Sequence, residues 1–189
     1  MSSSSAGATW LVEPGGVGAL RLGQPVPAAL VDRLAAGEGT YAAGYLADGV
    51  AFDGFRLDEP ALTIVLSRGP FAERDRKGGA DGAPPAPPID GLRPRAVEAV
   101  REGATIRALM IHGRGPATAA GLGVGSTLAE LEAALPGLRL QAVPPTVGDD
   151  RAAAARAAEP GLVFCFRDVE AARAGAGVTR VDVRIPDSA

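Results

Sequence analysis

Residues 104–136 read ATIRALMIHGRGPATAAGLGVGSTLAELEAALP, and they predict a strand, a glycine-rich turn and a helix in direct succession. In the first part, Ile106, Ala108 and Met110 alternate with the residues between them. A period of two is typical of a strand that is buried on at least one face. We therefore expect residues 106–111 to form a central strand of a sheet.

A helix is predicted to begin at Thr127. The segment Thr127-Leu-Ala-Glu130 matches a capping box, in which the Thr hydroxyl accepts a hydrogen bond from the N–H of Glu130 and the Glu carboxylate accepts one from the N–H of Thr127. An apolar stripe follows at spacings of three and four, formed by Leu128, Leu131 and Leu135. Pro136 then ends the helix.

The rest of the chain predicts further helices and strands. We expect a helix over 26–36, one or two helical turns over 95–102, and a short Ala-rich helix over 150–158. Strands are expected over 18–22, 41–46, 50–57, 61–67, 138–143, 161–166 and 178–185. Asp48-Gly49 indicates a hairpin turn between two of these strands.

The final strand pattern favours a sheet with one buried and one solvated face. Valines at 181 and 183 alternate with Arg180, Asp182 and Arg184. Together the patterns predict an α+β fold, with a mostly antiparallel sheet packed by two main helices. Leu20-Arg-Leu-Gly23 and Leu122-Gly-Val-Gly125 each precede a helix and three strands, which leaves an internal β-α-β-β-β duplication as one alternative.

The domain organisation follows from composition along the chain. We expect residues 1–9 to be a flexible Ser-rich leader and residues 10–189 to be a single domain. Within it, a Gly/Pro-rich stretch at 68–93 separates a first half, 10–67, from a second half, 94–186. Because this stretch mixes charges with a proline run, we interpret it as a mobile insertion without a continuous helix or strand.

Composition excludes several classes of protein. The 189 residues carry a net charge of −3 and are only 4% aromatic, and the arginines are dispersed among acids, so we expect no nucleic-acid partner. Cys165 is the single cysteine, which excludes an intrachain disulfide and a cysteine-based zinc site. Its apolar surroundings in LVFCF predict a buried, small hydrophobic residue.

The sequence leaves two alternatives for the cellular compartment of the protein. The chain has no apolar run of the roughly 18 residues that a membrane span needs, and Met1-Ser-Ser-Ser-Ser-Ala-Gly lacks the basic and apolar regions of a signal peptide. Either the protein is cytoplasmic, or the sequence begins after an export signal that was removed. A Ser-rich segment is also typical of the residues directly after the lipid-bearing Cys of a bacterial lipoprotein.

With these residues in view, the chain resembles a family of bacterial envelope lipoproteins regulated by the envelope-stress sigma factor, sigma-E, which carry a domain of unknown function. The resemblance lies in Gly16-Val-Gly-Ala-Leu20, in the strand 105–111 and in Thr118-x-x-Gly121-x-x-Val124-Gly-Ser-Thr127. The loop 112–121 departs from the pattern, because it reads HGRGPATAAG in place of acidic residues. The resemblance implies an exported, lipid-anchored protein that faces the periplasm at the outer membrane, and it implies no catalytic residue.

Chemistry-bearing residues are few. Glycines before a helix can bind phosphate, but a P-loop needs a Lys before its Ser/Thr, and Val124-Gly125 supplies none. His112 is the only histidine, and the chain contains no G-x-S-x-G motif. We therefore expect no catalytic residue, metal ligand or cofactor, and we take His112, Arg114 and Thr118 as candidate binding residues.

Two functional hypotheses remain. The first is a non-enzymatic envelope protein, lipid-anchored or secreted, that acts as a binding or structural module for an envelope protein or a small ligand. In this case the membrane is reached only through an N-terminal lipid anchor that lies outside the sequence. The alternative is a cytoplasmic ligand-binding domain or enzyme with its site in the loop 112–125.

Overall fold

The computed structural model describes residues 10–45, 50–77, 89–143, 153–156 and 161–185. The expected leader 1–9 and the expected turn at Asp48-Gly49 lie outside these residues. The helices are α1 (Ala28–Ala35), α2 (Pro70–Lys77), the 3-10 helix η1 (Ile89–Leu92), α3 (Arg93–Arg101), α4 (Leu128–Ala134) and α5 (Val169–Arg173). Across the described part of the chain, none of these helices has the length and apolar character needed to span a membrane.

The strands form two antiparallel sheets. They are β1 (Val12–Glu13), β2 (Gly16–Val17), β3 (Leu20–Arg21), β4 (Thr40–Tyr45), β5 (Ala51–Leu57), β6 (Leu62–Leu66), β7 (Ile106–Ile111), β8 (Arg139–Ala142), β9 (Ala153–Arg156), β10 (Leu162–Phe166) and β11 (Arg180–Arg184). The small sheet has the order β1-β2-β3 and the large sheet the order β4-β5-β6-β7-β11-β10-β9-β8. The predicted α+β class and the central position of β7 are confirmed.

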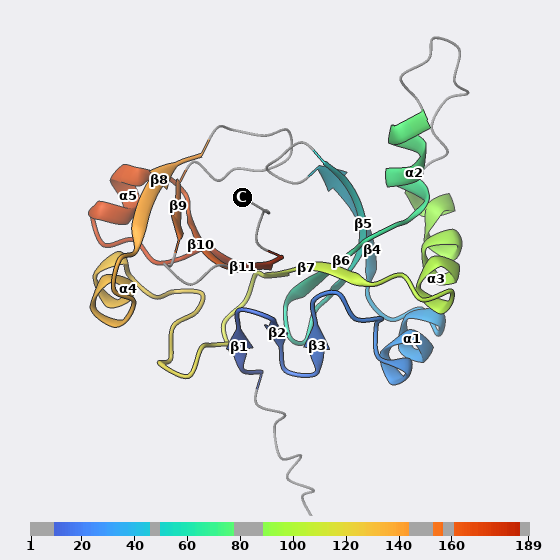
Figure 1. The fold of residues 1–189 in the computed structure, drawn as a ribbon, viewed down its shortest axis with the longest axis horizontal. Coiled ribbons are helices and arrows are strands. Elements are labelled where there is room, and N and C mark those ends of the chain that lie inside the picture. Colours follow the sequence, from blue (N-terminus) through green and yellow to red (C-terminus); the bar gives the residue numbers. More distant parts are fainter. Residues whose placement is uncertain (1–9, 46–49, 78–88, 144–152, 157–160, 186–189) are drawn as a thin grey trace, which may run out of the picture.

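The large sheet curves into a trough with all helices on its outer face (Figure 1). Helices α1, α2 and α3 lie outside the arm formed by β4 to β6, and α4 and α5 lie outside the arm formed by β8 to β10, while the small sheet lies beneath the central strands. We call the inner surface, opposite the helices, the trough face. Five helices are described where two main ones were expected, because short helices also cover each arm.

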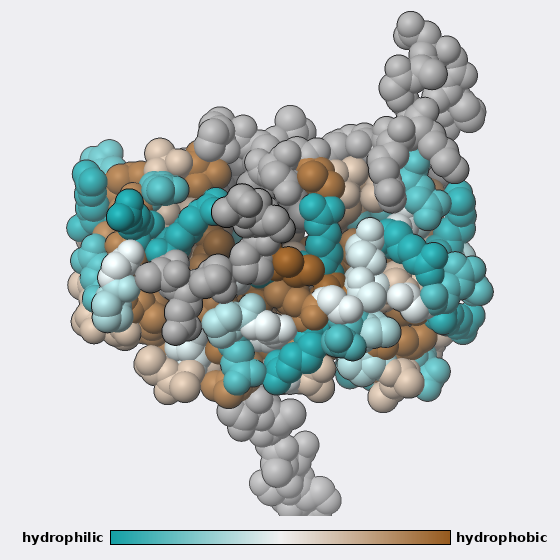
Figure 2. All heavy atoms as spheres, in the orientation of Figure 1, coloured by the Kyte–Doolittle hydropathy of each residue, from teal (hydrophilic) through white to brown (hydrophobic). Residues whose placement is uncertain are grey.

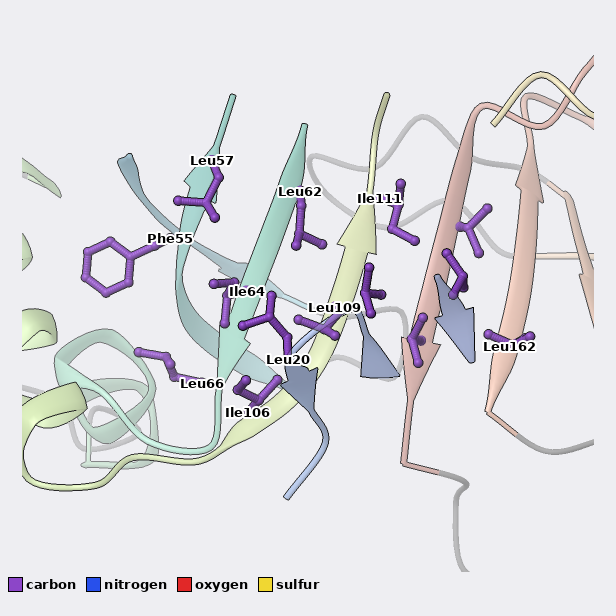
Figure 3. Packing of buried hydrophobic residues seen from close by; sticks show 14 of the residues in the cluster. Leu20, Phe55, Leu57, Leu62, Ile64, Leu66, Ile106, Leu109, Ile111 and Leu162 are labelled. Atoms are coloured by element: carbon purple, nitrogen blue, oxygen red, sulfur yellow. The ribbon is translucent and has the colours of Figure 1, made fainter. Parts of the chain in front are cut away.

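The hydrophobic core lies between the outer face of the sheet and the helices. Figure 3 shows its central side chains, with Leu62, Ile64 and Leu66 of β6 beside Leu109 and Ile111 of β7. All five are at most 2% exposed. Full burial of one such side chain contributes about 1.5–3 kcal/mol. This layer therefore fixes which side of every strand faces the helices, and it leaves the alternate residues for the trough face.

The chain contains a structural repeat. In the first half, α1 is followed by β4, β5 and β6, then by the helices α2, η1 and α3, and then by β7; in the second half, α4 is followed by β8, β9 and β10, then by the helix α5, and then by β11. In the first half, a row of paired residues runs through Tyr41, Phe55, Ile64 and Leu109. In the second half, the matching row runs through Leu140, Ala155, Phe164 and Val181. The repeat thus consists of one helix, three strands, a helical segment and a fourth strand. The expected β-α-β-β-β unit differs from it, because no named strand directly precedes α4 and because β9, expected as a helix, adds a strand to the second half.

The same hydrogen bonds precede the first helix of each half. The N–H of Gly23 donates to the carbonyl of Ile106, and the N–H of Gly125 donates to the carbonyl of Val178, both at 2.8 Å. Both glycines have positive φ, +74° and +98°, where a residue with a Cβ is strained. The expected correspondence of Leu20–Gly23 with Leu122–Gly125 therefore holds, although only the first of these segments contains a named strand.

The two halves meet around a local two-fold relation. Ile111 lies opposite Val181, and Leu109 lies opposite Val183. In the repeat, Leu109 corresponds to Val181 and Ile111 corresponds to Val183. Exchanging the two halves therefore converts one of these pairs into the other. The residue pair between them, Met110 and Asp182, therefore marks the centre of the repeat.

A β-bulge changes the expected faces of β7. Val65 lies opposite Ala108, whereas Leu66 lies opposite Ile106, so Arg107 is an extra residue of β7 between these two pairs. Ile106 consequently packs in the main core, while Ala108 and Met110 lie on the trough face. The expectation that these three residues share a face was wrong for this reason.

Two further expectations were also wrong. Residues 153–156, expected within an Ala-rich helix, form β9, because this segment pairs with β8 on one side and β10 on the other. Residues 70–77, expected within an irregular insertion, form helix α2. Tertiary pairing overrides the high helix propensity of alanine in the first case.

Asp53 of β5 explains why α2 forms. Its carboxylate accepts hydrogen bonds from the N–H groups of Phe71 at 3.0 Å and Ala72 at 2.8 Å, in the first turn of the helix. A negative charge at this end also suits the helix dipole. The hydroxyl of Tyr41 donates to the same carboxylate at 2.6 Å. Burial, followed by the hydrogen bond and charge of Asp53, raises the pKa of Tyr41 well above its ordinary value.

Candidate functional site

One row of paired residues crosses the whole trough face. Every strand of the large sheet contributes one residue, in the order Thr40, Arg56, Thr63, Met110, Asp182, Val163, Arg156 and Arg139. Directly paired residues point to the same side of a sheet. Sequence alternation alone could not reveal this row, because it depends on the register of every strand pair.

Apolar side chains form the floor of the trough on both sides of Asp182. Val65, Ala108 and Met110 cluster with Phe52 in the first half. Ala154, Val163 and Cys165 cluster with Val143 in the second half. Figure 2 shows hydrophilic residues at both outer ends of the molecule and hydrophobic atoms in the middle of the same view. The prediction that Cys165 is buried is confirmed, since it is 0% exposed.

Asp182 occupies the centre of the row and is 0% exposed. Its Oδ1 accepts a hydrogen bond from Nε of Arg180 at 2.7 Å, and its Oδ2 accepts one from Nη2 of Arg184 at 2.5 Å. The Sγ of Cys165 lies 3.7 Å from Oδ2. The expectation of a solvated face was therefore wrong at Asp182, because two guanidinium groups compensate the carboxylate that the trough buries.

His112 follows β7 and makes a separate polar contact on the trough face. Its Nε2 lies 2.9 Å from the Thr63 hydroxyl, in a partly buried position. The ring nitrogen donates or accepts in this bond according to the tautomer. Of the candidate binding residues, His112 is the one that the structure places on the trough face.

Arg114 and Thr118 lie in the loop that leads to α4. Arg114 is exposed and its guanidinium borders Gly125, where an added Cβ would come within 3.2 Å of Nε. Thr118 closes its own turn, because its hydroxyl accepts from the N–H of Leu122 at 3.1 Å. Within the described residues, no hydrogen bond joins any two of the three candidates. The loop glycines serve the turn, since a Cβ on Gly123 would lie 2.7 Å from a backbone oxygen.

Three exposed arginines of the row were missed from the sequence. Arg56, Arg139 and Arg156 stand on the trough face and are all exposed. They belong to different strands, and Arg156 belongs to the segment expected as a helix. Among the described residues, no group of three or more His, Cys, Asp or Glu side chains could hold a metal ion.

The chain is similar to a solved protein structure. No family model matches the chain, and no curated protein matches it. The crystal structure of the uncharacterized protein yfeY from Escherichia coli is similar at 13% sequence identity and a TM-score of 0.49. The similarity covers 93% of this chain and 99% of that one.

Proposed function

We propose that this protein is a non-enzymatic binding module of the bacterial envelope, lipid-anchored or secreted and facing the periplasm. It binds an envelope protein or a small ligand through the trough face. The observation that supports binding is the row of paired residues, in which Arg56, Arg139 and Arg156 are exposed on the same face of the large sheet. Arginine forks match carboxylate and phosphate groups, so anionic groups are the natural ligands of this surface.

The polar centre of the trough favours a binding role over catalysis. Both carboxylate oxygens of Asp182 already accept hydrogen bonds from arginines, and the His112 ring is bonded to Thr63. A general base acts on a nucleophile within hydrogen-bond reach, and one partner of His112 is the Thr63 hydroxyl on the buried strand β6. The His112–Thr63 hydrogen bond joins the end of β7 to β6, whereas the contacts of Asp182 with the two arginines lie within β11.

The envelope location rests on the resemblance of segments 16–20, 105–111 and 118–127 to sigma-E-regulated lipoproteins. It is tested by expressing the gene with its natural upstream sequence in its own host. We expect incorporation of labelled palmitate, or secretion, and recovery outside the cytoplasm. Recovery in the cytoplasm, without lipid, would contradict this part of the proposal.

Binding through the trough is tested by site-specific photocrosslinking in the same cells. A photoreactive amino acid is placed at Arg56 or at Arg139, and at the exposed Glu98 on outer helix α3 as a matched control. Adducts are identified by intact mass, which detects protein and small-molecule partners alike. We expect adducts at the two trough positions and not at Glu98. Equal labelling at all three positions, or labelling at Glu98 alone, would refute the trough as the binding surface.

A further inference from the structure

The end of the trough at β8 carries two arginines directly opposite each other. Arg139 of the edge strand β8 pairs with Arg156 of β9, and both residues are exposed. Directly opposed side chains in an antiparallel pair have Cβ atoms about 4.5–5.5 Å apart. Among the described residues, neither guanidinium has an acidic partner. Two like charges at this spacing destabilise the strand pair.

The repeat shows that the fold does not require this charge pair. The corresponding position in the first half, on edge strand β4 and its neighbour β5, pairs Thr40 with Arg56. Arg156 therefore corresponds to Arg56, whereas Arg139 corresponds to Thr40, which carries a neutral hydroxyl. The second cation adds repulsion without any packing role that the matching half needs.

The geometry of the pair suits one kind of anion. Arg139 and Arg156 each offer a planar fork of N–H donors. A carboxylate is satisfied by one such fork, whereas a phosphoryl dianion has three terminal oxygens and enough charge for two. Gln141 lies two residues beyond Arg139 on the same face of β8, is exposed, and offers an amide donor beside the pair.

We infer that Arg139 and Arg156 form a phosphoryl-binding site at the β8 end of the trough. The site takes a terminal phosphate group, either as inorganic phosphate or as a phosphate monoester on a larger molecule. This inference rests on the proposed function, because it names the ligand chemistry of the trough face. The phosphoryl group offsets the repulsion between the two guanidinium groups.

The inference is tested by titrating the full chain with inorganic phosphate at constant ionic strength and pH 7.5, following the arginine Nε–Hε signals by NMR. Wild type and Arg95→Gln, a matched control at an exposed arginine of outer helix α3, are expected to bind with the same affinity. Arg139→Gln and Arg156→Gln are each expected to bind at least tenfold more weakly. Without phosphate, both variants should melt no lower than wild type, because each substitution relieves repulsion.

A second titration separates the two sources of the phosphate group. Vesicles of phosphatidylcholine containing phosphatidic acid present a phosphate monoester, and phosphatidylcholine alone is the control. Arg139-dependent binding to the first vesicles but not the second identifies a surface-borne ester, and binding of inorganic phosphate alone identifies the free ion. Equal weakening by Arg95→Gln and Arg139→Gln, or no saturable binding in either titration, overturns the site. If photocrosslinking at the trough persists in that case, the proposed function stands and only the phosphoryl site fails.

Discussion

Replacing Asp182 with alanine is expected to destabilise the fold by about 3–5 kcal/mol, the usual cost of removing one partner from a buried ion cluster. The carboxylate is fully buried, and the side chains of Arg180 and Arg184 are only 15% and 22% exposed. Without Asp182, both guanidinium groups keep their burial and lose the carboxylate charge that Asp182 supplies. For a domain of this size, each kcal/mol shifts Tm by about 2–4 °C, so the melting point should fall by about 6–20 °C.

A triple variant separates this cost from simple loss of contacts. The repeat places Met110 at the position equivalent to Asp182, so the sheet accepts methionine there. Replacing Arg180, Asp182 and Arg184 together with methionine removes all the charges, and it should cost less than Asp182→Ala alone.

Urea unfolding followed by circular dichroism measures the free energy of each variant, with Asp58→Ala at an exposed position as the control. A loss below about 1 kcal/mol for Asp182→Ala would refute the reasoning, because removing one partner from a buried ion cluster costs more than that. A triple variant less stable than Asp182→Ala would refute it as well.

Two further predictions concern helix ends. Asp53→Ala removes the carboxylate that accepts hydrogen bonds from the N–H groups of Phe71 and Ala72 and from the Tyr41 hydroxyl. At roughly 1–3 kcal/mol for each of the three donors, we expect a loss of about 3–9 kcal/mol, together with faster amide exchange in α2. Unchanged exchange at Ala72 would contradict this role. The pKa of Glu130 is lowered chiefly by the hydrogen bond that its carboxylate accepts from the N–H of Thr127. The ionised carboxylate therefore stabilises the fold at pH values above its ordinary pKa. This contribution is lost as the pH falls through the lowered pKa. The unfolding free energies of wild type and Glu130→Gln should therefore differ at pH 7 and converge in acid. A difference in unfolding free energy that grows toward low pH would contradict this prediction.

Local chemistry was sufficient to predict the helix boundaries that side chains fix. The capping box at Thr127 is present, with the N–H of Thr127 donating to Glu130 at 2.7 Å, because its partners are only three residues apart. A similar signal was overlooked at Asp168, whose carboxylate accepts from the N–H of Ala171 at 2.6 Å and begins α5. That short helix was therefore accessible from the sequence, by the same N-cap rule.

The candidate site was only partly accessible. His112 was found because it is a unique residue at a strand end, and the structure places it on the trough face beside Thr63. Arg139 and Arg156 were not found, because an exposed arginine carries no local sign of its cross-strand neighbour. The segment of β9, Ala153–Arg156, even has the composition of a helix, and only its pairing with β8 and β10 makes it a strand.

The sequence by itself determined the α+β class, most strands, the cap of α4, the burial of Cys165 and the correspondence between Gly23 and Gly125. These features depend on residue type and on spacings of a few positions, which the chain carries locally. Only the tertiary structure decided the bulge at Arg107, the burial of Asp182 and the row that brings arginines of separate strands onto one face. Those features depend on register, and register is set when the two halves pack their core and pair β7 with β11.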